Sequence, residues 1–167
     1  QLRKLDGVIA ATRGNHGQSV ALCARQYGMS ATIVVPHGNS VEKNAAMRAL
    51  GAELIEHGAD FQAARLYAES LAEEKGWFMV PSFHPLLVTG VASASLELFR
   101  AVPDIDTLYV PIGLGSGIAA AIAARNALGL STEIVGVVSS QAPAYSKSFK
   151  ERKAVDAEVT TQLSDGM

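Results

Sequence analysis

The chain has 167 residues, 49% of them hydrophobic and 18% charged, with 14 Lys and Arg against 16 Asp and Glu. This size and apolar content exclude a disordered chain and a disulfide-stapled miniprotein, and the lack of excess positive charge argues against a nucleic-acid partner. No run approaches the roughly 18 apolar residues of a membrane span, and the single Cys23 excludes a disulfide framework or a multi-cysteine metal site.

Two features of the chain as a whole set further expectations. Its single cysteine is what we expect of a cytoplasmic protein, and it begins with Gln1 without a charged-then-apolar leader. We also expect the chain to be a piece of a longer protein, truncated at both ends. Such a piece would leave apolar sheet surface uncovered, which predicts self-association into a homo-oligomer.

Short apolar runs typical of buried strands alternate with helical patterns along the sequence. The strands are expected at Gly7–Ala11, Ala31–Pro36, Ala52–Glu56, Trp77–Val80, Thr107–Ile112 and Glu133–Val138. Repeated strand–helix–strand units indicate parallel strands joined by crossover helices. The sequence therefore predicts an α/β fold of open parallel sheets, with helices on both faces in three layers.

Helices are predicted where apolar residues recur three or four positions apart. One such face contains Val20, Cys23, Ala24 and Tyr27, which assigns Cys23 to the core. Another contains Phe61, Ala64, Leu66, Ala68 and Leu71. Asn39, followed by Glu42, is expected to cap a helix over Val41–Leu50. Helix ends are expected at Gly28, Gly51, Gly76 and Gly129.

The segment Pro81-Ser82-Phe83-His84-Pro85 interrupts this rhythm, because two prolines fall within five residues. We predict a domain boundary near it, with one domain over residues 8–88 and part of a second over residues 89–167.

The first polar turn, Thr12-Arg13-Gly14-Asn15-His16-Gly17-Gln18, directly follows the strand that ends at Ala11. Ligands of open parallel sheets bind outside the carboxyl ends of the strands. Main-chain N–H groups at a helix start point toward an anion, and glycines let the main chain approach it closely. An ordinary helix start with solvated polar side chains is the alternative.

The second turn, Gly113-Leu114-Gly115-Ser116-Gly117, lies between a strand and an Ala-rich helix. Its alternating glycines favour a loop whose N–H groups wrap a phosphate. A dinucleotide fingerprint is absent, because Ile118 takes the place of the last glycine and Glu133 precedes its strand. A tight turn needed only for packing is the alternative.

Together these segments resemble the threonine/serine dehydratase family, the fold type II enzymes that use pyridoxal 5'-phosphate (PLP). The first turn resembles the family's S-x-G-N-H-x-Q motif, and Gly113–Gly117 stands where the family has its phosphate loop. Three shorter stretches agree as well: Val35-Pro36 with Ser40, Lys43 and Ala46; Leu50–Glu53; and Pro81–Pro85 with Gly90 and Glu97. The resemblance covers nearly the whole chain, and it identifies residues 8–88 with the small cofactor-covering domain.

The resemblance assigns roles to the residues of both turns. Asn15 would hydrogen-bond the phenolic oxygen of PLP. The residues that would hold the substrate carboxylate are Thr12, Arg13, Gly14 and His16. The residues that would hold the cofactor phosphate are Gly113, Leu114, Gly115, Ser116 and Gly117. No metal site is expected, because Val138 stands where some relatives have an acidic residue.

The family's Schiff-base lysine belongs to a Ser-Phe-Lys motif upstream of the first turn. The resemblance therefore implies that this lysine lies before Gln1, and we expect no catalytic residue within the chain. Ser148-Phe149-Lys150 imitates that motif but lies in a charged segment that reads as a surface helix. Lys150 is therefore not expected to be catalytic.

The implied activity of the parent protein is elimination of water and ammonia from L-threonine or L-serine, which yields a 2-oxo acid. Two alternatives stay open. One is another fold type II enzyme, such as a serine racemase-like enzyme. The other is that the 167-residue chain is itself a non-catalytic module that binds PLP or phosphate.

Overall fold

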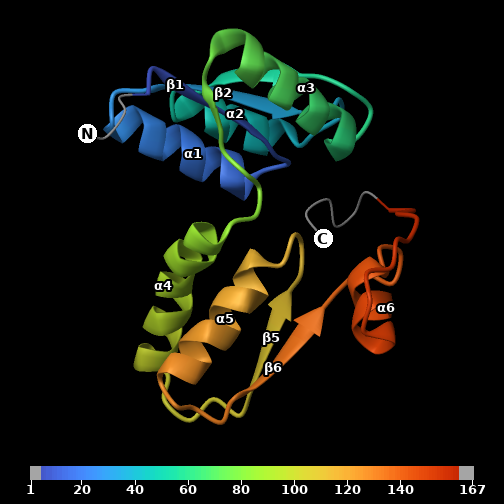
Figure 1. Cartoon of the computed structure of the whole chain (residues 1–167). Coiled ribbons are helices and arrows are strands. Elements are labelled where there is room, and N and C mark those ends of the chain that lie inside the picture. The colour runs from blue at the N-terminus through green and yellow to red at the C-terminus, as the bar shows by residue number, and fades with distance from the viewer. Residues whose placement is uncertain (1–4, 162–167) are drawn as a thin grey trace. The chain divides into compact units, whose positions relative to one another are not determined.

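The computed structural model describes residues 5–161, in which six strands alternate with six helices (Figure 1). The chain divides into two compact units, Gln1–Ser82 and Phe83–Met167, which we call unit 1 and unit 2. The division falls inside the Pro81–Pro85 segment. The domain ranges 8–88 and 89–167 stay predictions.

Unit 1 contains a four-stranded parallel sheet in the order β3-β2-β1-β4. Its elements are β1 (Gly7–Ala11), α1 (Asn15–Gln26), β2 (Ser30–Val35), α2 (Val41–Ala49), β3 (Glu53–Glu56), α3 (Phe61–Lys75) and β4 (Phe78–Met79). The chain adds β2 and β3 on one side of β1 and then β4 on the other. The winding direction therefore reverses at β1, and the carboxyl ends of strands at such a switch point form the usual ligand crevice.

The core of unit 1 has two sides because successive strand residues point to opposite faces of a sheet. On one face Val8, Ala10 and Ile33 pack with Val20 and Ala24 of α1 and with Met47 of α2. On the other face Ile9, Ala11 and Val34 pack with Ala64, Ala68 and Leu71 of α3. The sheet thus lies between α1 and α2 on one side and α3 on the other, which gives the three predicted layers.

Unit 2 contains the parallel pair β5 (Thr107–Pro111) and β6 (Glu133–Val137) and the helices α4 (Pro85–Ala101), α5 (Ser116–Ala127) and α6 (Ala144–Glu151). Helix α5 packs on both strands, and α4 packs along α5 (Figure 1). Tyr109 and Val137, in the two strands, stay 68% and 40% exposed. Within the described part of unit 2, the strand pair is therefore far less covered than the sheet of unit 1.

The predicted fold class is confirmed, and all six predicted strands are present: β1 has the predicted bounds, and the ends of the other five lie within one residue of the prediction. The four glycines expected to end helices, Gly28, Gly51, Gly76 and Gly129, all have positive φ angles between 63° and 98°. This conformation is favourable for glycine alone among common residues, and it stops each helix.

Three local predictions were wrong. Ser40, and not Asn39, caps α2, because its hydroxyl accepts the Lys43 N–H at 3.4 Å. The Asn39 amide instead donates to Asn44 Oδ1 at 2.6 Å. Cys23 and Tyr27 are exposed, since α1 buries Val20, Ala21 and Ala24 beside a buried Gly17.

Leu66 is also exposed, because α3 turns Ala64, Ala68, Leu71 and Ala72 toward the sheet.

Within residues 5–161, none of the helices combines the length and the apolar character that crossing a bilayer requires.

Candidate functional site

The turn between β1 and α1 lies at the switch point of the sheet in unit 1, and three hydrogen bonds fix its main chain. Thr12 is buried, and its N–H donates to Val34 O at 3.1 Å. Its Oγ1 accepts the Gly14 N–H at 3.0 Å. The hydroxyl of Ser82, which follows β4, donates to Ala11 O at 3.4 Å. The carboxyl ends of β1 and β4 are thereby joined beside the turn.

The first turn of α1 presents N–H groups that no side chain in the described part of the molecule caps. Gly14 is the N-cap residue and has no side-chain acceptor, and the turn contains no acidic residue. The first N–H groups of a helix have no partner inside the helix, and the helix dipole adds partial positive charge there. Asn15 is exposed at this helix start, and Arg13 is half-buried before it. The arrangement is suited to binding an anion.

His16 also belongs to this turn, and its Nε2 is buried with no hydrogen-bond partner among the described residues. Burial removes water from the imidazole and lowers the pKa of His16 below its ordinary value of 6.5. At neutral pH the ring is therefore neutral.

We expect this buried histidine to make stability depend on pH. In the folded chain the pKa of His16 is lowered, so below pH 6.5 the unfolded chain takes up a proton that the folded chain does not. The free energy of unfolding should therefore fall as the pH drops through 6.5, and level off below the lowered value. Urea unfolding at pH 7.5 and 5.5 measures this change in the free energy of unfolding. In the His16→Asn variant the part of the change that is due to His16 should be absent. An equal slope in both proteins would show that His16 is not its source.

The glycine-rich turn of unit 2 lies at the carboxyl end of β5. Gly115, the N-cap residue of α5, has φ 97°, a conformation that side chains with a Cβ rarely adopt. A Cβ added at Gly117 would meet no heavy atom within 4 Å, so the space in front of the helix start is open. The Tyr145 hydroxyl donates to Leu114 O at 3.0 Å, which ties the turn to α6.

The helices that follow the two glycine-containing turns, α1 and α5, differ from α2, α3 and α4 in how their first turns are capped. Helices α2, α3 and α4 are capped by the side chains of Ser40, Asp60 and His84, whereas α1 and α5 start from glycine without a side-chain cap. A phosphate fits the start of α5, because no side chain among residues 5–161 caps its N–H donors and none of them would meet a Cβ at Gly117. The donor set therefore suits the phosphate of PLP.

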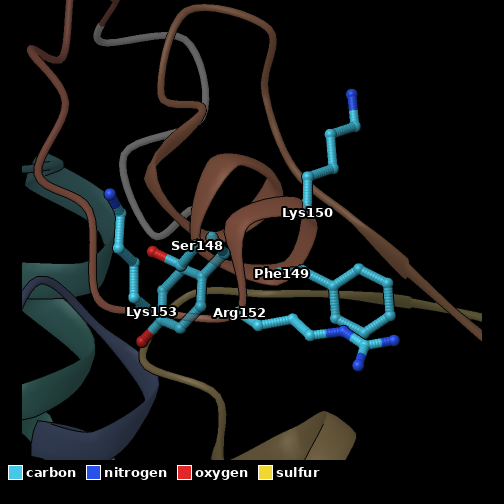
Figure 2. Close-up of a pocket in the computed structure, with 6 residues that line it drawn as sticks. Ser148, Phe149, Lys150, Arg152 and Lys153 are labelled. Atoms are coloured by element: carbon cyan, nitrogen blue, oxygen red, sulfur yellow. The ribbon is translucent and has the colours of Figure 1, made fainter.

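The Ser148-Phe149-Lys150 run lies in α6, and with Tyr145, Arg152 and Lys153 it lines an open surface pocket (Figure 2). Phe149 is 88% exposed, and Lys150 extends from the helix in a different direction from Lys153. Ser148 Oγ accepts the Val155 N–H at 3.0 Å, so this serine shapes the end of the helix. That Lys150 is not catalytic stays a prediction.

Each set of predicted site residues lies together in one turn. In unit 1, residues 12–14 connect β1 to α1, and Asn15 and His16 begin α1; in unit 2, residues 113–115 lie between β5 and α5, and Ser116 and Gly117 begin α5. Their individual roles stay predictions. Sequence reasoning missed Tyr145 and Ser82 as supports of the turns, because single hydroxyl groups 31 and 71 residues away in sequence carry no spacing signal.

Comparison with known proteins places the chain in a family. The model of the family described as "Pyridoxal-phosphate dependent enzyme" matches residues 1–167. The biosynthetic L-threonine dehydratase IlvA of Pasteurella multocida is 37% identical over 167 residues, which are 99% of this chain and 32% of the relative. The catabolic L-threonine dehydratase TdcB of Staphylococcus aureus is 35% identical over 165 residues, 98% of this chain and 48% of the relative.

Solved structures agree. The processed form of threonine deaminase isoform 2 from Solanum lycopersicum has a TM-score of 0.88 at 32% identity, covering 99% of this chain and 49% of that chain. Maize serine racemase has a TM-score of 0.88 at 28% identity, covering 97% of this chain and 50% of that one. The chain thus spans half or less of the length of these relatives. The match over its full length and the shared fold show that it belongs to the family of pyridoxal-phosphate dependent enzymes, of fold type II.

Proposed function

We propose that the full-length protein is a PLP-dependent ammonia-lyase that acts on a β-hydroxy amino acid, L-threonine or L-serine. The substrate loses water across its α and β carbons, and a water molecule then hydrolyses the product to a 2-oxo acid and ammonia. The observation that carries this proposal is the pair of uncapped turns, each at the carboxyl end of a parallel strand. Its relatives at 35–37% identity are named L-threonine dehydratases.

In this proposal unit 2 holds the cofactor. Gly113, Leu114, Gly115, Ser116 and Gly117 donate main-chain N–H groups to the phosphate, and the dipole of α5 favours its charge. The positive φ of Gly115 lets the turn curve around the anion, while Tyr145 holds the Leu114 carbonyl and so limits the movement of the turn. When bound, PLP supplies an electron sink that stabilises negative charge at the substrate's α carbon.

Unit 1 holds the substrate. The first N–H groups of α1 and the turn residues Thr12, Arg13, Gly14 and His16 bind the α-carboxylate, while the Asn15 amide donates to the phenolic oxygen of PLP. The buried Thr12 accepts the Gly14 N–H, which fixes the turn so that the following N–H groups are directed at the ligand, while Gly14, having no side chain, lets the carboxylate approach the main chain closely. Because His16 is neutral at pH 7, it adds no charge to this turn.

A serine racemase-like activity is the second candidate. It is favoured by the TM-score of 0.88 with maize serine racemase, equal to that with the tomato threonine deaminase. Both activities need the cofactor phosphate bound in unit 2 and the substrate carboxylate bound at the turn between β1 and α1. They differ in whether the β-hydroxyl group leaves or a proton returns to the opposite face of the α carbon.

The test is to incubate the purified full-length protein and PLP with L-threonine, L-serine and D-serine, and to measure 2-oxo acid, ammonia and the enantiomer formed. We expect 2-oxobutanoate from L-threonine, with ammonia in equal amount. Borohydride trapping followed by peptide mapping should label a lysine outside residues 1–167. D-serine formation without 2-oxo acid would favour the racemase, and trapping at Lys150 would contradict the assignment of the cofactor site.

A further inference from the structure

The helix α6 of unit 2 ends on an arginine in a conformation that favours glycine. Arg152, the C-cap residue of α6, has φ 54° and ψ 31°, which is the left-handed region. Residues with a Cβ rarely adopt this conformation, and at the end of α3 the same place is taken by Gly76. A glycine would suit the end of α6 better for stability alone. An unfavourable conformation that is kept points to a use of the side chain.

The end of α6 also carries more positive charge than the helix needs. Lys150, Arg152 and Lys153 line the surface pocket described above (Figure 2). Lys153 pairs with Glu151 at 3.2 Å, whereas Lys150 and Arg152 form no ion pair among residues 5–161. The helix dipole favours one cation in the last turn, and Lys150 already takes that place. The surplus charge attracts an anion.

Two aromatic rings form the apolar part of the same pocket. Tyr145 and Phe149 lie four positions apart on α6, the spacing of neighbours on one helix face, and are 43% and 88% exposed. The Tyr145 hydroxyl donates to Leu114 O at 3.0 Å, so this ring is fixed before any ligand binds. Exposed rings side by side suit the stacking of a flat ring.

Hydrogen bonds hold the cations beside the rings. Ser148 Oγ accepts the Val155 N–H at 3.0 Å and donates to Val155 O at 3.3 Å, and the Lys153 N–H donates to Ser148 O at 3.3 Å. The chain after α6 is thereby tied back to the helix. Figure 2 shows Phe149 and Arg152 extending toward the same side. The pocket has a volume of about 820 Å³, which is within the range of small-molecule sites.

We propose that the end of α6 is a binding site for a small organic anion that has a flat ring and at least two negative groups. The ring stacks on Phe149 and Tyr145. The planar guanidinium of Arg152 binds one anionic group with two hydrogen bonds, and the two lysines attract the others. The site uses no main-chain donor of the α5 turn, so the inference does not depend on the proposed function.

The experiment is isothermal titration calorimetry on the full-length protein loaded with PLP. The probes are trimesate, which is a benzene ring with three carboxylates, its cyclohexane analogue with the same charge, and phenyl phosphate. The variants are Arg152→Gly, Phe149→Ala and Lys147→Gln. Lys147 is exposed on the same helix but does not line the pocket, so it is the matched control for loss of one cation. A thermal melt gives Tm for each protein.

We expect trimesate to bind the wild type about fivefold more tightly than the cyclohexane analogue, because stacking favours the flat ring. Arg152→Gly should weaken binding about tenfold, the size of one charge-assisted contact, and its Tm should not fall, because glycine favours the left-handed conformation. Phe149→Ala should remove the preference for the flat ring without lowering Tm. Lys147→Gln should bind within about twofold of the wild type.

The inference is overturned if neither trimesate nor phenyl phosphate shows saturable binding, or if Arg152→Gly binds as tightly as the wild type. Equal losses in Lys147→Gln and Arg152→Gly overturn it as well, because they would indicate unspecific attraction to a basic helix. If Arg152→Gly fails to fold, Phe149→Ala decides the result. Turnover of hydroxy amino acids is not part of this readout, so the site and the proposed activity succeed or fail separately.

Discussion

Gly117→Asp is expected to raise the thermal stability of the PLP-free protein and to weaken PLP binding by more than a hundredfold. Gly117 is the second residue of α5, where a carboxylate interacts favourably with the helix dipole, by about 0.3–1 kcal/mol. Replacing a glycine inside a helix adds a further gain, and the new side chain meets no neighbour. In the proposed cofactor site the same carboxylate would stand where the phosphate binds, so two anions would compete for one set of N–H donors.

Gly117→Asn separates charge from size. Asparagine has the same shape as aspartate and carries no charge, so it should weaken PLP binding less. Titration of the full-length apoprotein with PLP, followed by absorbance, gives the dissociation constants, and a thermal melt gives the stabilities. PLP binding to Gly117→Asp within threefold of the wild type would show that the phosphate is held elsewhere.

Gly17→Ala is expected to destabilise the protein by about 2 kcal/mol, although glycine-to-alanine changes inside helices usually stabilise. The added methyl would stand 2.5 Å from Met47 Sδ, 2.5 Å from Thr12 Cγ2 and 3.1 Å from Ile33 Cγ2. All three neighbours are buried, so the methyl forces α1 away from the sheet. Because Thr12 must move as well, the Thr12–Gly14 hydrogen bond should weaken and KM should rise.

Gly90→Ala is the matched control, since Gly90 is also helical but an added Cβ meets nothing within 4 Å. It should raise the free energy of unfolding by about 0.5–1 kcal/mol. Thr12→Ser, which removes Cγ2 and keeps Oγ1, should recover part of the stability of Gly17→Ala. Urea unfolding of the four proteins measures these differences, and equal stability of Gly17→Ala and wild type would contradict the packing described for α1.

The sequence alone determined the order of strands and helices, the parallel sheets and the two polar turns. It did so because buried parallel strands appear in the sequence as continuous apolar runs. In addition, few other residues can adopt the main-chain conformation of the glycines that end helices or precede them. The positive φ angles of Gly28 and Gly115 bear this out. Motif order along the chain was also sufficient to identify the PLP-dependent family.

The tertiary structure alone decided which side of each helix is buried and which residues support the turns. Cys23 and Leu66 fit an apolar face by spacing, yet the buried faces of α1 and α3 are formed mostly by alanines and Gly17, with Val20 and Leu71 the larger side chains among them, because the helices pack closely on the sheet. The placement of Met47 on Gly17 and of Tyr145 on Leu114 depends on contacts between distant segments. Such contacts leave no periodic pattern in the sequence, since they are fixed by how whole elements pack.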